Sequence, residues 1–368
     1  MSLKLQFPLP LRLLLCQTGL WAVSFLFLPL LLREQGYGKW VFIFGYMALA
    51  IVSVVVLLFV TTYNSKWFLR MSFILNSGMA LGFFVLPLQI AFFGYVIGWA
   101  GLIILFWVPL NMLFFQESHS ARHAQDSWRY MVAPGLLSMV IPPLGALMMR
   151  FYGYRWLFLL TVGMYLIAMA WFWRRVPDVV WKVQRREAIV RFKGLKTISM
   201  FEGALHFFSS VILSVYALRF LQNETDVGLF WSYVAITGVV AGFLVARVSD
   251  GTQERKKYII ALFSMLFLCV IGFMFARTLA WFLVVMGVYT VMATISAPIR
   301  LAISMDVKEK DMNFWWGREL FLNIGRAGTL AVAGLLFFKE WYGLLFGMYA
   351  MLILLYPFLI FHKLKKVK

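Results

Sequence analysis

The sequence has little charge and very little cysteine. Only 13% of its 368 residues are Asp, Glu, Lys or Arg, whereas soluble domains carry about 25%. Acidic residues are the scarcest, with 15 Asp and Glu against 34 Lys and Arg. Its two cysteines, Cys16 and Cys269, exclude a disulfide framework and a cysteine-rich zinc site. Because 63% of the residues are hydrophobic, a water-soluble fold is excluded and lipid must surround the chain.

Long apolar segments recur along the whole chain. A membrane-spanning helix needs about 20 mainly apolar residues. Twelve segments satisfy this requirement, near 11–32, 38–61, 69–88, 92–116, 129–149, 154–174, 198–221, 227–248, 258–277, 279–303, 316–338 and 341–362. The uncharged stretch 71–116 is too long for one span, and we expect it to turn between Pro87 and Gly94. The predicted fold is an all-α integral membrane protein.

The basic residues are distributed unevenly between the two sides of these spans. With the N-terminus taken as inside, the loops on the other side contain only Arg33, Lys39, Arg150, Arg155, Arg219, Arg277 and Lys339. All other cations except Arg326 fall on the N-terminal side. Because Lys and Arg are retained in the cytoplasm, we expect a multi-pass protein of the plasma (inner) membrane with both termini cytoplasmic.

The longest polar stretch, 177–197, separates six spans from six spans. Its mixture of apolar residues and cations is typical of an amphipathic helix on a membrane surface, or of a solvated linker. We expect one six-helix bundle at 1–176 and a second at 198–368. Pro109 precedes Arg129 by the same offset as Pro298 precedes Arg318, and this register indicates two pseudo-symmetric repeats.

The loop after the eighth span resembles the signature of the major facilitator superfamily. That signature has a Gly, an Asp four residues later and then a basic cluster. Asp250, Arg255 and Lys256 match it, although two of its glycines are replaced. The resemblance implies two six-helix bundles, with these residues closing a cytoplasmic gate. The equivalent loop of the first half, 61–66, lacks the Asp, and a simple topology anchor is the alternative for the matching cluster.

The fifth span contains a second resemblance to this family. Pro142 and Gly145 match its antiporter motif, Gly-Pro-x-x-Gly-Gly, whereas Ile141 and Ala146 replace two of the glycines. Proline bends a helix and glycine permits close packing. The resemblance therefore implies a dry hinge and favours export, and a plain helix kink is the alternative.

Ionisable residues inside spans are costly and are candidate functional residues. Glu202 and His206 are four residues apart and share a face of the seventh span. Glu319, Asn323 and Arg326 form one polar stripe on the eleventh span. The family resemblance implies that both helices border a central cavity, where these groups would bind substrate or couple to protons. A structural Glu–Arg pair is the alternative.

The first six spans contain no interior carboxylate. Gln17, Trp21 and Asn111 offer neutral hydrogen bonds and stacking to a substrate instead. A separate group, His119, His123 and Asp126, has metal-ligand spacing on a helix but no fourth ligand. We therefore expect no metal. No phosphate-binding loop or hydrolase motif is present either, so we expect no cofactor and no enzymatic activity.

Together these features predict a secondary or facilitative transporter that moves a small solute by alternating access. Arg326 favours an anionic, zwitterionic or amphipathic solute, and a proton-coupled exporter is one form of this hypothesis. We expect a monomer that contacts membrane lipid and no nucleic acid. The alternatives are a membrane-embedded enzyme acting on lipid or an isoprenoid, and a non-transporting sensor or scaffold.

Overall fold

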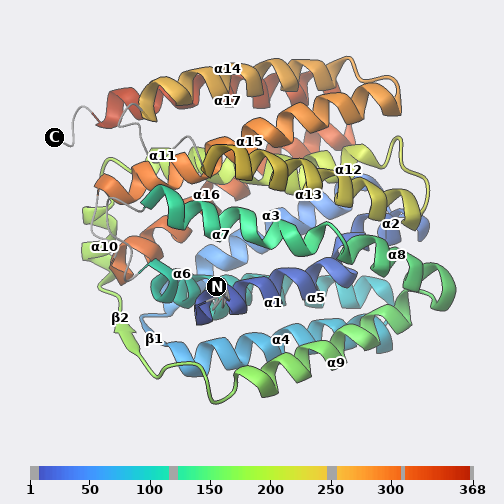
Figure 1. The fold of residues 1–368 in the computed structure, drawn as a ribbon, viewed down its shortest axis with the longest axis horizontal. Helices are drawn as coiled ribbons and strands as arrows, with labels where there is room; N and C mark the ends of the chain where they lie inside the picture. The colour runs from blue at the N-terminus through green and yellow to red at the C-terminus, as the bar shows by residue number, and fades with distance from the viewer. Residues whose placement is uncertain (1–7, 116–122, 247–254, 308–310, 365–368) are drawn as a thin grey trace, which may run out of the picture.

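The chain forms a bundle of helices that run side by side along its longest axis (Figure 1). The computed structural model describes residues 8–115, 123–246, 255–307 and 311–364. Within them, eleven helices are long and apolar enough to cross a membrane, and 258–274 is a shorter apolar helix. The predicted all-α membrane fold is confirmed, with the addition of one two-stranded sheet.

The first half contains six predicted spans, three of which are built from more than one helical segment. Its helices are α1 (Leu9–Ser24), η1 (Phe25–Phe27), α2 (Leu28–Glu34), α3 (Lys39–Phe59), α4 (Ser65–Val85), α5 (Leu88–Leu102), η2 (Ile103–Trp107), α6 (Val108–Phe115), α7 (His123–Ser138), α8 (Ile141–Tyr152) and α9 (Tyr154–Phe172). The third and fourth spans are separated at Leu86 and Pro87, at the start of the expected interval. Proline lacks the backbone donor needed to continue α4.

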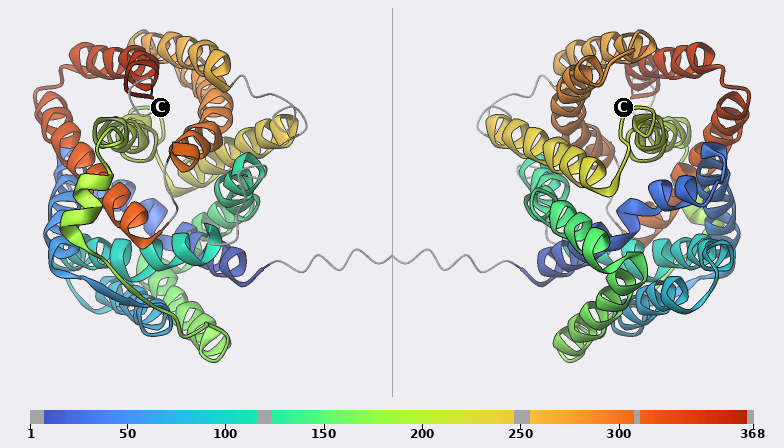
Figure 2. Two further views of the ribbon diagram at one scale, coloured as in Figure 1. Left: turned by 90° about the vertical axis from the view of Figure 1, so that its left-hand side faces the viewer. Right: turned by 90° about the vertical axis from the view of Figure 1, so that its right-hand side faces the viewer.

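The second half contains the other six predicted spans, one of which includes the shorter apolar helix at 258–274. Its helices are α11 (Lys196–Phe207), η4 (Phe208–Ile212), α12 (Leu213–Ala217), α13 (Glu224–Ala246), α14 (Arg255–Met274), α15 (Leu279–Val307), α16 (Met312–Phe338) and α17 (Tyr342–Leu364). Figure 2 shows the first half, blue to green, on one side and the second half, yellow to red, on the other. Both η2 and η4 are π-helical, a local widening that is frequent at functional sites.

The segment between the halves lies at one end of the bundle. Its strand β2 (Val180–Lys182) pairs antiparallel with β1 (Thr62–Asn64), so that Trp181 lies opposite Tyr63. The short helix α10 (Arg185–Arg191) follows and packs on α16. We refer to the end that carries β1, β2 and α10 as the linker end, at the left of Figure 1, and to the other as the opposite end.

This segment contacts both halves. On the first half, the Ser65 hydroxyl donates to the Pro177 carbonyl at 2.6 Å. On the second half, the Arg191 guanidinium lies 3.4 Å from an Asp311 carboxylate oxygen, and the Phe192 ring stacks on Phe321 with centroids 5.6 Å apart. The apolar side of this segment is therefore covered by α16.

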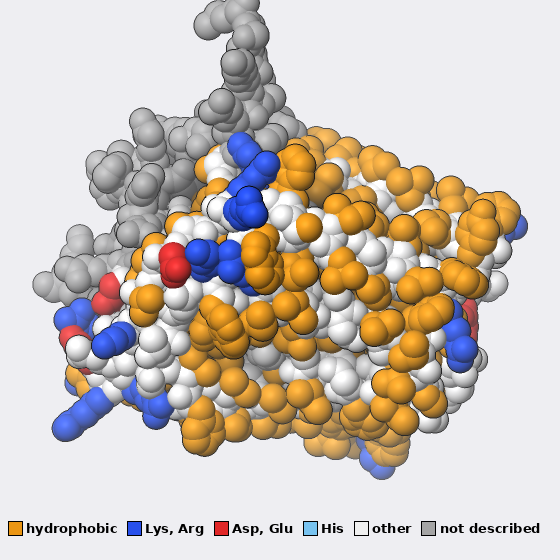
Figure 3. Space-filling view, turned by 90° about the horizontal axis from the view of Figure 1, so that it is seen from below, with side chains coloured by type: hydrophobic (Ala, Val, Ile, Leu, Met, Phe, Trp, Pro, Cys, Tyr) orange, Lys and Arg blue, Asp and Glu red, His pale blue; other side chains and the backbone are white. Residues whose placement is uncertain are grey.

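The outer surface is apolar in its middle and basic at its ends. Figure 3, which views the face formed by α4 and α9, shows hydrophobic side chains over most of the surface and Lys or Arg side chains toward both ends. Large side chains such as Ile167 on α9 and Phe93 on α5 are well exposed. An apolar band flanked by cations matches a helix bundle embedded in lipid.

Candidate functional site

The candidate site is organised by a close crossing of α11 and α16. A Cβ atom added to Gly203 would overlap the carbonyl oxygen of Leu322, and one added to Gly325 would overlap that of Met200. Only glycine allows two helix backbones to approach this closely. The crossing brings the polar residues of α11 beside the polar stripe of α16.

Glu202 of α11 is buried and fully engaged at this crossing. One carboxylate oxygen accepts a hydrogen bond from Arg318 Nη2 at 3.1 Å, and the other accepts one from the Tyr356 hydroxyl at 2.8 Å. The Glu202 side chain is 5% exposed and that of Arg318 is 13% exposed. Glu202 and Arg318 therefore form an ion pair between two helices, close to the alternative foreseen from the sequence, although with Arg318 as the cation.

The predicted polar stripe on α16 forms a connected group. Arg326 Nη1 donates to Asn323 Oδ1 at 3.1 Å, and Asn323 Nδ2 donates to the Glu319 backbone carbonyl at 2.8 Å. The Glu319 carboxylate lies 3.7 Å from Arg326 and 3.9 Å from Arg318. Both distances exceed a hydrogen bond, so Glu319 balances two arginines without binding either closely.

Cations outnumber carboxylates in this cluster. Arg300 lies 5.9 Å from the ring of Tyr356, the residue that donates to Glu202, so the cluster holds Arg300, Arg318 and Arg326 against Glu202 and Glu319. In each of the three arginines Nε is buried with no hydrogen-bond partner in the described structure. Buried donors without partners are costly. The cluster therefore has an unmet capacity to bind an anion.

The predicted His206 lies at the open side of the cluster. Its side chain is exposed, and its ring lies 5.7 Å from that of Phe207. Its neighbour Phe207 is buried, with the Arg326 guanidinium 4.8 Å from the ring centroid. The arginine cluster therefore borders open space on the His206 face of α11.

The predicted residues of the first half form neutral pairs instead. The Gln17 and Asn76 side chains exchange hydrogen bonds at 3.3 and 3.1 Å, and both residues are buried. Asn111 accepts a hydrogen bond from the Tyr130 hydroxyl at 2.6 Å. Neither Gln17 nor Asn111 joins the arginine cluster, so the sequence-predicted site residues form separate groups in the two halves.

A chain of aromatic side chains connects the two halves. The Trp21 indole donates to the Tyr95 hydroxyl at 3.5 Å, which lies 2.8 Å from the Tyr46 hydroxyl. The Tyr46 ring then meets Phe207 edge to face, with centroids 5.5 Å apart. Because Phe207 supports Arg326, this chain runs from the predicted Trp21 to the arginine cluster.

The predicted gate lies largely outside the described residues. Asp250 is not among them, and Arg255 and Lys256 are described only as the start of the α14 backbone. At the linker end, the described contacts between the halves include the Trp316 indole, which donates to the Leu57 carbonyl at 3.0 Å, and the Phe115 ring, which stacks on Trp315 with centroids 5.1 Å apart. The gate residues therefore stay a prediction.

At the opposite end, Arg33 joins the halves. Its Nη1 donates to the carbonyls of Leu218 and Leu221 at 2.9 and 2.7 Å, and its Nη2 donates to Gln222 at 2.5 Å. These carbonyls follow α12, where a cation complements the negative end of the helix dipole. In the sequence, Arg33 is distinguished only as one of the few cations on that side.

The predicted hinge residues lie at a tight contact among three helices. The fifth span is interrupted at Met139 and Val140, just before Pro142. A Cβ atom added to Gly145 would overlap the Val23 carbonyl of α1, and one added to Gly228 of α13 would lie 3.0 Å from the Pro142 carbonyl. The hinge role stays a prediction, but this contact is close and apolar.

The histidine group with metal-ligand spacing lies partly outside the described residues. His119 falls outside the described residues, and the parts of the chain that are described contain no group of three His, Cys, Asp or Glu able to hold a metal. Three residues of the site could not be connected to it from the sequence: Arg300, Arg318 and Tyr356. The two arginines lie toward the ends of α15 and α16, and Tyr356 lies on α17. Only their contacts in the folded structure show that they belong to the site.

Comparison with known proteins defines the family. The model of the Major Facilitator Superfamily matches residues 129–313, and no curated protein matches significantly. Among solved structures, the human organic anion transporter MFSD10 (TETRAN) is 15% identical, with a TM-score of 0.67, covering 96% of this chain and 100% of that chain. A bacterial homologue of the iron transporter ferroportin, in an outward-facing state, is 14% identical with a TM-score of 0.68, covering 97% and 98%. The chain belongs to the Major Facilitator Superfamily and is a multi-pass membrane transporter.

Proposed function

We propose that this transporter carries organic anions, which bind at the arginine cluster between α11 and α16. The observation that supports this most directly is the excess of three arginines over two carboxylates, with three buried Nε donors unpaired. A single charge near the centre of a bilayer costs about 2.5–3.5 kcal/mol on insertion scales. An anionic substrate would supply the partner that the protein lacks.

Arg326 is the residue best suited to bind the anionic group. Its only hydrogen bond among the described residues is to Asn323, which orients the guanidinium and leaves its other donors available. Glu319, at 3.7 Å, is close enough to compensate the charge when the site is empty. A carboxylate or sulfonate can displace it, because the planar guanidinium binds such groups with two parallel hydrogen bonds.

The surroundings of Arg326 favour a substrate with an aromatic or apolar body. Phe207, Tyr46 and Trp21 extend from the guanidinium toward the first half, and aromatic faces bind planar apolar groups well. The similar human structure is named as an organic anion transporter. At 15% identity that likeness establishes only the fold, but the substrate class in its name agrees with the chemistry of this cluster.

Transport would follow from alternating separation of the two halves. Contacts between them lie at both ends, through Trp316 and Leu57 at the linker end and through Arg33 and the α12 carbonyls at the opposite end. To open one end, the contacts between the halves at that end must break while the contacts at the other end remain. The distribution of basic residues places the linker end in the cytoplasm in this proposal.

Flux into proteoliposomes tests the proposal. We expect aromatic carboxylates to be transported and their neutral amides to be excluded. Arg326→Lys should preserve folding and weaken anion binding about 10- to 100-fold, because a hydrogen bond to a charged group contributes about 1.5–3 kcal/mol. Arg150→Lys, on an exposed arginine at the end of α8, is the matched control and should transport normally.

A charge-balanced variant separates substrate binding from a structural role. Arg326→Gln combined with Glu319→Gln removes one cation and one anion together. If this double variant transports anions at the wild-type rate, Arg326 is only a structural partner of Glu319 and the proposal fails. Loss of anion flux with unchanged thermal stability supports it.

A further inference from the structure

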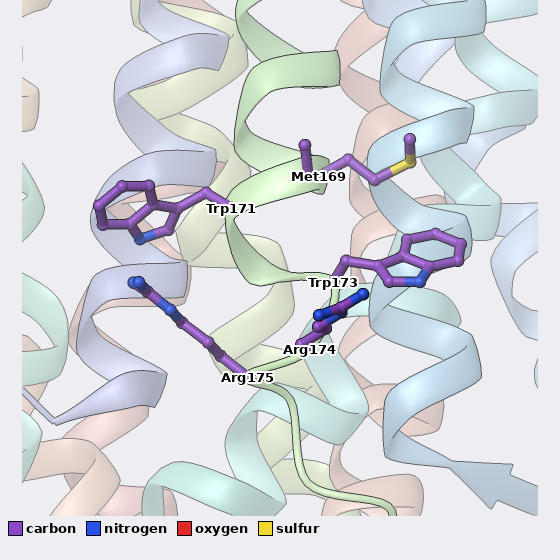
Figure 4. Close-up of a pocket in the computed structure, with 6 residues that line it drawn as sticks. Met169, Trp171, Trp173, Arg174 and Arg175 are labelled. Carbon is purple, nitrogen blue, oxygen red and sulfur yellow. The ribbon is translucent and has the colours of Figure 1, made fainter.

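A depression lined by arginine and tryptophan side chains lies at the linker end of α9, away from the arginine cluster. A shallow depression of about 550 Å³ is lined there by Met169, Ala170, Trp171, Trp173, Arg174 and Arg175. Figure 4 shows Trp171 and Arg175 on one side of the helix end, and Trp173 and Arg174 on the other. The depression therefore combines two indole rings with two guanidinium groups.

The cations of this depression lack anionic partners. Arg174 is exposed and makes no hydrogen bond or ion pair within the described structure. Among the described residues, the Arg175 guanidinium interacts with the Trp171 ring, 4.1 Å from its centroid, and with no carboxylate. The neighbouring Arg70 of α4 stacks on Trp173 at 4.1 Å and donates from Nε to the Trp173 carbonyl at 3.0 Å. Three guanidinium groups thus lie around this end of α9, and no carboxylate among the described residues binds any of them.

An apolar strip leads from this depression toward the middle of the bundle. Leu160, Ile167 and Trp171 recur at helical spacing on α9, and Ile167 and Trp171 are 71% and 59% exposed. Gly163, on the same strip, would meet no atom within 4 Å if it had a Cβ, so the strip is open above it. Figure 3 shows that this face is apolar in the middle with cations at its end.

We propose that this surface binds one anionic phospholipid of the leaflet at the linker end. The phosphate would lie beside Arg175 on the Trp171 side of the helix end, with Arg174 as a second cation at the headgroup level, and an acyl chain would follow the strip over Gly163. The two indoles would lie at the level of the headgroups, where tryptophan is enriched in membrane proteins. Basic pockets between helices at a membrane surface bind anionic headgroups by the same charge complementarity.

The test is lipid retention by the purified full-length protein, measured by native mass spectrometry. Phosphatidylglycerol and phosphatidylcholine with identical acyl chains are the probes. The wild type should retain phosphatidylglycerol preferentially. Arg174→Ala combined with Arg175→Ala should reduce this preference about 30-fold. Each cation near an anionic headgroup raises the affinity about fivefold, and the variant removes two of them.

Two further variants distinguish this site from general surface charge. Arg186→Ala combined with Lys193→Ala removes two exposed cations at the same end and should retain the preference. Gly163→Leu keeps every charge but fills the strip, and should lower retention of phosphatidylglycerol. Equal loss of preference in the Arg186/Lys193 variant, or unchanged retention in the Arg174/Arg175 variant, overturns the proposal.

Inorganic phosphate tests whether the lipid is needed at all. Millimolar phosphate should leave phosphatidylglycerol retention unchanged, because it lacks the acyl chain that the strip would hold. If phosphate alone displaces the lipid from the wild type but not from the Arg174/Arg175 variant, the depression is a site for free phosphate, and the lipid assignment is wrong.

Discussion

The first half buries neutral polar groups that pair with one another, whereas the second half buries charges that do not balance. Gln17 and Asn76 satisfy each other's amides. In contrast, Arg318 and Arg326 share Glu319 at distances longer than a hydrogen bond. A neutral pair can remain in a membrane at small cost, but an unbalanced cluster is expensive. The difference indicates that the second half recognises charge, while the first offers an aromatic surface and neutral hydrogen bonds.

The two halves do not differ in backbone packing, because each uses a glycine to bring two helices close together. Gly145 lies against the Val23 carbonyl in the first half, and Gly325 lies against the Met200 carbonyl in the second. Both contacts need the absence of a side chain. Close helix packing is therefore a shared feature of the halves, and buried charge is what separates them.

The largest effect should come from removing one member of the buried ion pair. Glu202→Gln leaves Arg318 with only the distant Glu319, and breaking a buried pair in this way typically costs about 3–5 kcal/mol. The free energy of unfolding in mixed micelles measures this. The double variant Glu202→Gln with Arg318→Gln should recover most of the loss, and a double variant as unstable as the single one would contradict an ion-pair role.

A smaller effect should follow from filling the helix crossing. Gly325→Ala forces α11 and α16 apart, and overpacking of this kind costs about 1–3 kcal/mol. Gly328→Ala on the same helix is the control, because a Cβ there meets no atom within 4 Å. Thermal unfolding of both variants compares them directly. Equal melting temperatures would show that the crossing is looser than the structure indicates.

The smallest effect should come from the neutral pair of the first half. Gln17→Leu removes both hydrogen bonds to Asn76, whose Nδ2 keeps its bond to the Ser72 carbonyl. The loss should cost about 0.6–1.7 kcal/mol, from the mean to the maximum measured for hydrogen bonds between membrane helices. Adding Asn76→Leu should restore part of the stability, since no amide is then stranded. Unfolding in mixed micelles is the measurement. A loss as large as that of Glu202→Gln would remove the proposed contrast between the halves.

Features that depend on local composition could be predicted from the sequence. The spans follow from hydrophobicity over about 20 residues, and the predicted segments match the observed helices to within a few residues at most boundaries. The stripe of Glu319, Asn323 and Arg326 follows from helical periodicity alone. Its internal hydrogen bonds, from Arg326 to Asn323 and from Asn323 to Glu319, are within one helix and therefore also local.

Features that depend on which helices touch could not be predicted in this way. Arg318 lies in the second turn of α16. Nothing in the neighbouring sequence indicates that its partner is Glu202, which is 116 positions away. Asn76 lies 59 positions from Gln17, and Arg33 finds its carbonyl partners 185 to 189 positions along the chain. The pairing of β1 with β2 across the linker is of the same kind.

The sequence by itself determined that the protein lies in a membrane, where its long apolar helices run, and that charge is concentrated in its second half. Those properties are sums over neighbouring residues, because lipid responds to the local density of apolar and charged groups. Only the tertiary structure decided that Arg300, Arg318 and Arg326 converge on two carboxylates and leave an unmatched positive charge. That outcome depends on the crossing of α11 and α16 at Gly203 and Gly325, a contact between surfaces that lie far apart in the chain.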